Sequence, residues 1–164
     1  MALTIKQQEE TLVTFMSYNS TGISSVKCKW ICDICDEYDV DYLAIQEHFK
    51  KTKSIDKYFR DNFHGYNSYV IPGYRPPGQD SGRCKAGLAQ LSKKFYCVKK
   101  DRVTTRGFRI QAQVLNMPTC KLLWLNTYMP TDIRYTILTY RRSCWKLRQF
   151  YPVAITLTLS GLGT

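Results

Sequence analysis

The chain has 164 residues, of which 44% are hydrophobic and 13% aromatic, and a formal net charge of +11. This length allows one sizeable core, belonging to one domain or a piece of one, and the even spread of apolar residues argues against disorder of the whole chain. The chain contains no long apolar run, and its first ten residues lack the apolar segment of a signal peptide, so neither a membrane span nor a secretory leader is predicted. We therefore expect a globular intracellular protein.

The basic charge indicates a polyanionic partner, because clustered Lys and Arg side chains gain affinity for phosphates by releasing counterions. Five of the basic residues lie after Asp132, in a stretch without an acid. The excess of basic over acidic residues in the part of the chain before these five is therefore moderate.

The first third of the chain has the pattern of a β-α-β unit. Residues 12–18 are rich in β-branched and aromatic types and predict a buried strand, which a turn at Gly22 closes. Ser24 or Ser25 can cap a helix that runs to about Glu37. Its apolar face is predicted from positions at helical spacing, namely Trp30, Ile31, Ile34 and Tyr38. Residues 42–45 form a short apolar run suited to a strand that is covered on both faces.

The next segments predict a helix, a strand, a long loop and an antiparallel meander. Their expected ranges are 52–62 for the helix, 66–71 for the strand, 72–83 for the loop, and 87–92, 95–103, 108–115 and 122–128 for the meander. Within the third meander segment, apolar and polar residues alternate in the manner of a half-buried strand. This order of elements predicts an α/β fold with a mixed sheet.

Four collinear segments carry a family resemblance. They are Ser-Tyr-Asn at 17–19, Gln-Glu-His at 46–48, Gly-Arg-Cys-Lys-Ala-Gly-Leu-Ala at 82–89 and Leu-Asn-Thr-Tyr-Met-Pro at 125–130. Over residues 11–133 the chain resembles the first half of the endonuclease/exonuclease/phosphatase superfamily. Arg-Ile-Gln-Ala at 109–112, and Thr131-Asp132 after the last segment, resemble the endonucleases of non-LTR retrotransposons most. The resemblance implies a DNase-I-like four-layer α/β sandwich with mixed and antiparallel sheets, truncated after roughly its first half.

The resemblance also implies a DNA phosphodiesterase site that uses Mg²⁺ or Mn²⁺. Glu47 matches the metal-binding glutamate, and Asn19 and Tyr128 match catalytic residues that can contact a phosphate oxygen. Gln46 and Asn126 are expected to hold these groups by hydrogen bonds. Judged on local sequence, Glu47 is a carboxylate at the end of an apolar strand, where sites in α/β sheets collect.

Each of these residues has a simpler structural interpretation. Glu47 could be an exposed charge at a strand end, Asn19 a turn-forming residue before Gly22, and Tyr128 a strand-end aromatic that is half in the core. Neither His48 nor His64 stands in a catalytic motif, because the family's histidine lies near the end of its domain.

Arg83, Lys85, Arg106 and Arg109 are interleaved with aromatic residues and are predicted to contact a nucleic-acid backbone. A solvated basic face is the alternative.

Seven cysteines in a chain without a secretory signal favour free thiols. Cys28, Cys32 and Cys35 have the spacing of an iron-sulfur ligand set, but they fall on a predicted helix with no glycine-rich segment after it. We expect thiols that pack along that helix.

The family's downstream Asp-x-Asn and terminal Asp-His pair have no counterpart in this sequence. We therefore expect a truncated endonuclease domain with no, or very low, activity as it stands. The expected organisation is an N-terminal extension at 1–10, a partial domain at 11–133 and an atypical tail at 134–164, which we hypothesise to be out of frame from about Cys144. Sequencing the transcript tests that hypothesis.

Two other functions stay open at this point. The chain could be a non-enzymatic nucleic-acid-binding or vestigial protein, or a phosphoesterase of the same fold that acts on another phosphate ester. The nucleus is a location compatible with a DNA partner, and the sequence makes no prediction of an oligomeric state.

Overall fold

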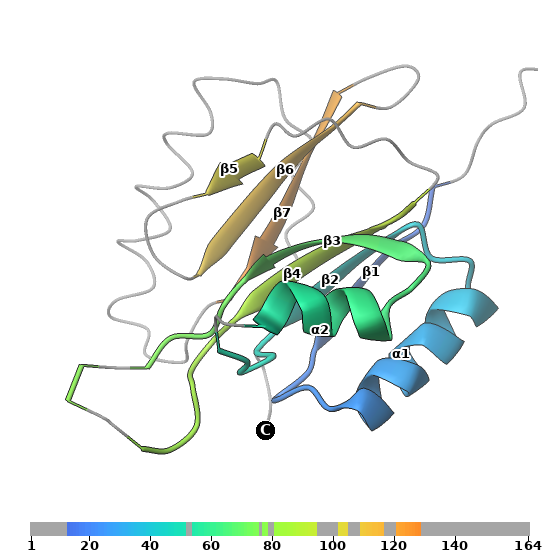
Figure 1. Cartoon of the computed structure of the whole chain (residues 1–164). Coiled ribbons are helices and arrows are strands. Elements are labelled where there is room, and N and C mark those ends of the chain that lie inside the picture. The colour runs from blue at the N-terminus through green and yellow to red at the C-terminus, as the bar shows by residue number, and fades with distance from the viewer. Residues whose placement is uncertain are drawn as a thin grey trace, which may run out of the picture.

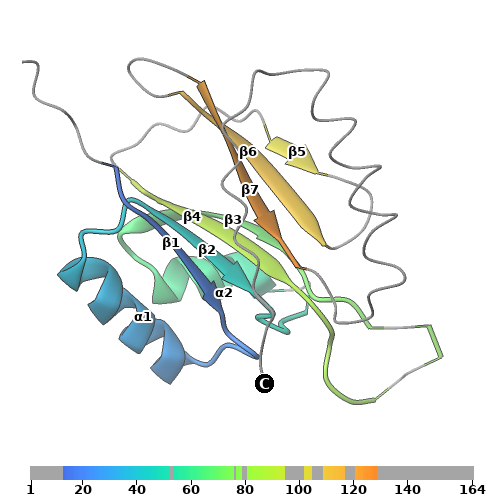
Figure 2. The ribbon, with the colours of Figure 1, turned by 180° about the vertical axis from the view of Figure 1, so that it is seen from behind.

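A four-stranded sheet is sandwiched between two helices and a second sheet in the computed structural model (Figures 1 and 2). The structure describes residues 13–51, 54–75, 77–78, 81–94, 102–104, 109–116 and 121–128. In chain order the elements are β1 (Phe15–Asn19), α1 (Ser25–Glu37), β2 (Tyr42–Gln46), α2 (Ile55–Asn62), β3 (Tyr66–Ile71), β4 (Leu88–Lys93), β5 (Arg102–Thr104), β6 (Ile110–Asn116) and β7 (Lys121–Thr127).

The first sheet has the strand order β1-β2-β4-β3, and the second has the order β5-β6-β7. β1 and β2 precede and follow α1 in the chain and run parallel to each other. β4 is antiparallel to both β2 and β3. The second sheet is an antiparallel meander. The predicted α/β class, with its β-α-β unit and its mixed and antiparallel sheets, is confirmed.

Helix α1 begins where the sequence predicts, but it packs through a different face. The Ser24 side chain accepts a hydrogen bond from the Lys27 backbone at 3.2 Å and so caps the first turn. The buried side chains are Cys28, Ile31 and Cys35, which lie three and four residues apart. The expectation for Trp30 and Tyr38 is wrong, because they are 50% and 63% exposed. Small cysteines, rather than the aromatic residues, allow the helix to approach the sheet closely.

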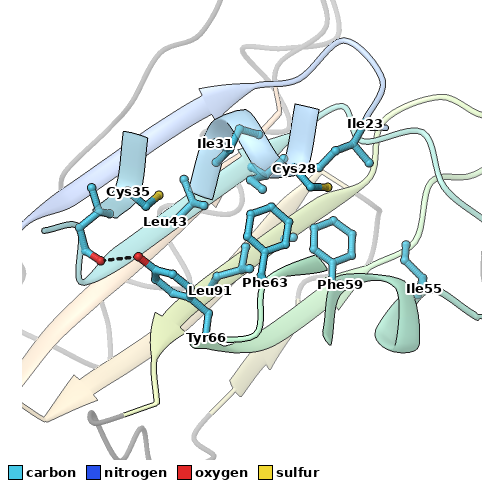
Figure 3. Close-up of a cluster of buried hydrophobic side chains, with 13 residues drawn as sticks. Ile23, Cys28, Ile31, Cys35, Leu43, Ile55, Phe59, Phe63, Tyr66 and Leu91 are labelled. Carbon is cyan, nitrogen blue, oxygen red and sulfur yellow. Dashed lines mark hydrogen bonds between the residues drawn. The ribbon is translucent and has the colours of Figure 1, made fainter. Parts of the chain in front are cut away.

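The core between the helices and the first sheet is shown in Figure 3. Phe59 of α2 and Phe63, which directly follows α2, stack with their ring centroids 5.8 Å apart and are fully buried. They share one cluster with Ile31 of α1 and Leu43 of β2. Burial of each such side chain contributes about 1.5 to 3 kcal/mol. This cluster fixes the two helices, and therefore the loops that follow them, relative to β2.

Strand β1 is less buried than its composition predicts. It lies at one end of the described sheet order, its residues are half-buried, and Phe15 is 38% exposed. The prediction of a buried first strand is wrong for this reason. β2 lies between β1 and β4 and is buried over its whole length, which confirms the strand predicted to be covered on both faces.

Strand β6 is buried on both faces, so the prediction of a half-buried strand is wrong. Ala112 and Val114 join a cluster on one face of the second sheet. The polar residues Gln111 and Gln113 are buried as well, on the alternate positions of the strand. Polarity alone therefore misassigns this second face to solvent.

Several sequence predictions fall outside the described residues. They are the extension at 1–10, the tail at 134–164, Arg106 and most of the strand predicted at 95–103. Over the described part of the chain, no helix is long and apolar enough to cross a membrane.

Candidate functional site

The carboxyl ends of β1, β2 and β7 point toward the same end of the molecule (Figure 2). Because β1 and β2 are parallel and in register, Asn19 lies beside Gln46. Glu47 follows directly after β2, and Tyr128 follows directly after β7. Residues from both sheets therefore meet at one edge.

Glu47 adopts a backbone conformation that side chains with a Cβ rarely take. Its φ is +54°, in the left-handed region, and Phe49 two residues later has a φ of +55°. Such a conformation costs about 1 kcal/mol or more per residue and persists only where the surrounding structure enforces it. Strain of this kind collects at functional sites, and here it redirects the half-buried Glu47 side chain at the end of β2.

The Tyr128 side chain lies close enough to Glu47 for the two to interact, which brings residues of the two sheets together. Burial raises the pKa of Tyr128 above its ordinary value, and the nearby negative charge of Glu47 raises it further. The positive charge of Arg109 acts on Tyr128 in the opposite direction. Arg109 also accepts a hydrogen bond from the Tyr128 backbone at 2.8 Å through its carbonyl oxygen.

Gln46 and Asn126 form a buried bridge beneath this pair. The Gln46 Nε2 donates to Asn126 Oδ1 at 2.7 Å and to Ser17 Oγ at 3.0 Å. The Asn126 Nδ2 donates to the carbonyl oxygens of Ala89 at 2.9 Å and Ile45 at 3.2 Å. These contacts connect β1, β2 and β4 to β7 just below Glu47 and Tyr128.

Two further buried amides belong to the same layer and were missed in the sequence. Gln111 Oε1 accepts from Asn126 at 3.3 Å, and its Nε2 donates to the Tyr69 carbonyl of β3. Gln90 Nε2 donates to the Trp124 carbonyl at 3.0 Å. Gln90 stands between Ala89 and Leu91, which is a signal in the sequence, whereas Gln111 alternates with apolar residues and gives no such signal. Tyr74 was also missed, and it lies near enough to Tyr128 to influence its pKa.

Asn19 forms a turn, which agrees with the simpler structural interpretation of its local sequence. Its Oδ1 accepts from the Thr21 backbone at 3.2 Å. Asn19 alternates along β1 with the partly buried Tyr18, so it shares a sheet face with Ser17 and Gln46. Asn19 therefore lies next to the Glu47 edge, with a turn-forming contact there.

The predicted nucleic-acid contacts divide between two places. Arg109 lies at the Glu47–Tyr128 edge. Arg83 and Lys85 are exposed on the loop that returns from β3 to β4. Arg83 lies over the Phe49 ring at 4.9 Å, and Lys85 pairs with Tyr74 through the backbone. Arg106 lies outside the described residues.

His48 is a buried structural residue. Its ring lies 3.0 Å from the Ile71 carbonyl through Nε2 and accepts from the Lys50 backbone at 3.0 Å through Nδ1. Burial lowers the pKa of His48 to about 4. A Cβ at Gly87 would lie 2.5 Å from the His48 Cε1 atom, so this glycine is what allows β4 to approach the ring.

The cysteines on α1 face partners other than a metal cluster. Cys28 Sγ lies 3.6 Å from the Tyr58 hydroxyl, and Cys32 Sγ donates to the Asn62 carbonyl at 3.4 Å. Burial raises the pKa of Cys32 to about 11, which disfavours the thiolate that a metal needs. Across the described side chains no three His, Cys, Asp or Glu residues are grouped as a metal site. These observations favour packed thiols.

Glu47 nonetheless suits a magnesium or manganese ion. Mg²⁺ prefers hard oxygen ligands and is commonly held by one or two carboxylates together with waters and substrate phosphates. Glu47 provides a half-buried carboxylate at a strand end, with the Tyr128 side chain close to it. A single carboxylate of this kind is compatible with an ion that phosphate and water also bind.

Comparison with solved structures identifies the fold. The structure resembles an AP endonuclease from Archaeoglobus fulgidus, with a TM-score of 0.62, 16% identity and coverage of 85% of this chain and 52% of that one. It also resembles the endonuclease domain of TRAS1, a telomere-specific non-LTR retrotransposon, with a TM-score of 0.52, 14% identity and coverage of 83% and 54%. For D. rerio TDP2 complexed with a single-strand DNA product, the TM-score is 0.53, the identity 12% and the coverage 85% and 56%.

These likenesses show that the chain has a DNase-I-like α/β fold, as the sequence motifs predicted. The chain spans about half the length of each of these structures. No protein-family model matches the sequence. No curated protein matches it either.

Proposed function

We propose that this chain provides the metal-carboxylate part of a DNA phosphodiesterase site, in an endonuclease domain of retrotransposon type. The proximity of Tyr128 to Glu47 carries the proposal, because it brings one predicted catalytic residue beside the predicted metal ligand across two sheets. The fold supports it, since proteins of this shape include an AP endonuclease, a retrotransposon endonuclease and a TDP2 with bound DNA product.

Each residue of the edge has a role in this proposal. Glu47 would hold the cation, which when bound would offset charge at phosphorus and lower the pKa of a nearby water. Tyr128 would donate a hydrogen bond from its hydroxyl to a phosphate oxygen, because the phenol stays protonated when its pKa is raised. Arg109 would add a positive charge beside the same oxygen. Gln46 and Asn126 would hold the edge together by their buried bridge.

The chain alone is expected to show no, or very low, nuclease activity. One carboxylate and one tyrosine do not provide a general base for water and an acid for the leaving oxygen. A nuclear location is part of the same proposal, since DNA is the proposed substrate.

A plasmid-nicking assay with Mg²⁺ tests the proposal. Any residual nicking should be lost in Glu47→Gln and retained in Glu37→Gln, an exposed glutamate at the end of α1. Nicking that survives Glu47→Gln would contradict the role of Glu47. Efficient cutting by the wild-type chain would contradict the expectation of no, or very low, nuclease activity. If no nicking is detected, Mn²⁺ binding by the same variants decides whether Glu47 is the ligand.

A non-enzymatic nucleic-acid-binding protein is the second candidate, and the distribution of basic residues favours it. Arg83 and Lys85 are exposed on the loop between β3 and β4 rather than at the ends of β2 and β7. In that case DNA binding would be insensitive to Glu47→Gln.

A further inference from the structure

The two peptide groups that flank the Cα atom of Glu47 are both held by the turn between β1 and α1. The carbonyl of the preceding peptide, on Gln46, accepts two hydrogen bonds from Ser20, one from its backbone amide at 2.9 Å and one from its hydroxyl at 2.9 Å. The carbonyl of the following peptide, on Glu47 itself, accepts from the Gly22 backbone at 2.7 Å. Because peptide groups are planar, fixing the plane on each side of a Cα atom fixes the φ and ψ of that residue. The turn therefore sets the backbone conformation of Glu47.

The hydroxyl of Ser20 adds a second donor to a carbonyl that already has one. Ser20 is buried, with an exposed fraction of 1%. Its backbone amide alone would satisfy the Gln46 carbonyl in the way that ladder bonds satisfy strand carbonyls. The hydroxyl occupies the second lone pair of the same oxygen. The second bond therefore restricts the direction of the peptide between Gln46 and Glu47.

Lys27 holds Ser20 in position from the first turns of α1. Its Nζ donates to the carbonyls of Ser20 at 2.7 Å and Gly22 at 2.9 Å. Hydrogen bonds from a charged donor are roughly twice as strong as those between neutral groups. The neighbouring Cys28 is buried in the core beneath α1. The position of the Ser20 hydroxyl is therefore set by a packed helix.

The conformation of Glu47 decides where its carboxylate lies. Its φ of +54° is unfavourable for a residue with a Cβ, so a less restrained Glu47 would also populate negative φ values. Its carboxylate would then leave the position beside Tyr128. Apparent affinity for a ligand falls in proportion to the fraction of molecules in the binding conformation. Restraint of this peptide therefore bears directly on what the carboxylate can bind.

We propose that Ser20 is a positioning residue for Glu47: its hydroxyl, bound to the Gln46 carbonyl, keeps the Glu47 carboxylate at the edge beside Tyr128. The inference rests on the proposed function in one respect, namely that a divalent cation is what this carboxylate binds. The hydrogen bonds of Ser20 restrain the turn whether or not a cation is present.

Two measurements on the full chain test this role. Hydrogen exchange of the Gly22 amide, measured without metal, reports opening of the turn, and the electron paramagnetic resonance signal of free Mn²⁺ reports the affinity of the carboxylate. Ser20→Ala should speed Gly22 exchange and weaken Mn²⁺ binding, each by about three- to tenfold, the factor that one net hydrogen bond contributes. Ser20→Thr keeps the hydroxyl and should stay close to the wild type in both. Residues 21 and 22, which set the intrinsic exchange rate of this amide, are the same in all variants.

Ser92→Ala is the matched control. Ser92 is a buried serine of β4 that pairs with Tyr42, at the opposite end of β2 from Glu47. Its substitution removes the same hydroxyl from a buried position and should leave both Gly22 exchange and Mn²⁺ affinity unchanged. Circular dichroism of each variant confirms that it is folded. The two alanine variants decide the question even if the added methyl group of Ser20→Thr is not accommodated.

Unchanged Gly22 exchange and Mn²⁺ affinity in Ser20→Ala, or equal changes in Ser92→Ala, would overturn the proposal. It would also be overturned if Ser20→Ala sped Gly22 exchange but left a Glu47-dependent Mn²⁺ affinity unchanged. Faster exchange in Ser20→Ala, combined with no Glu47-dependent Mn²⁺ binding in the wild type, would support the restraint of the turn by Ser20 and refute the proposed function.

Discussion

The peptide of Glu47 is held by the segments on both sides of it. Its carbonyl accepts from Gly22 at 2.7 Å, and the next carbonyl, of His48, accepts from Ile23 at 3.2 Å. These two bonds extend the contact between β2 and the β1 side of the sheet past Gln46, the last residue of β2. They compensate for the left-handed conformation of Glu47 and fix the direction in which its side chain leaves the strand.

His48 supports this turn only while it is neutral. Its folded pKa is about 4, against an ordinary value of 6.5, because burial disfavours the charged ring. Above pH 6.5 His48 is neutral in both the folded and the unfolded state. Its full contribution to stability is therefore present. As the pH falls from 6.5 to about 4 the unfolded chain is protonated and the folded protein is not, so stability is lost over this window.

We expect this loss to be about 3 kcal/mol between pH 7 and pH 4. The free energy of unfolding, measured with urea at both pH values, should fall by that much more in the wild type than in His48→Gln, which keeps a donor and an acceptor but does not titrate. His64→Gln, at an exposed turn residue, is the control and should behave like the wild type. An identical pH dependence in His48→Gln would disprove the role of His48.

At the scale of elements, the ends of β2 and β7 are positioned by buried amides. Gln46, Gln111 and Asn126 form one chain of hydrogen bonds across the two sheets. In the sequence, Gln111 occupies the polar phase of an alternating strand, which predicts solvent exposure. The prediction failed because the second face of β6 meets another sheet, and local alternation cannot report that contact.

Other elements were predictable because their signals are local. Tyr66–Ile71 was predicted to the residue, and the Ser24 cap and the end of α1 at Glu37 follow from short-range rules. The buried face of α1 was not predictable, since it depends on which residues are small enough to approach β2. Similarly, Glu47 and Tyr128 were each singled out by motif, but their proximity depends on two sheets packing together.

Asn126→Ala tests the amide layer. It would leave the Gln46 amide and the Ala89 carbonyl without their present partner in a buried position, which should destabilise the fold by about 3 kcal/mol. Asn67→Ala, at an exposed position of β3, should change the free energy of unfolding by less than about 0.5 kcal/mol. Urea unfolding at pH 7 measures both, and equal effects would show that the layer is not a stabilising bridge.

At the scale of the molecule, the described residues form a helix layer, a mixed sheet and an antiparallel sheet, with the candidate site at one edge of the two sheets. The motifs predicted this architecture because they lie at strand ends, where a common fold brings them together. The retrotransposon type of the domain and the roles of its residues stay proposals.

The central claim is that Glu47 holds a divalent cation at this edge. Mn²⁺ binding, followed by the electron paramagnetic resonance signal of the free ion in the presence of a short single-stranded oligonucleotide, tests it most directly. The account predicts that Glu47→Gln weakens Mn²⁺ binding by at least about tenfold and that Glu37→Gln leaves it unchanged. Equal Mn²⁺ affinity in the wild type and both variants would contradict it.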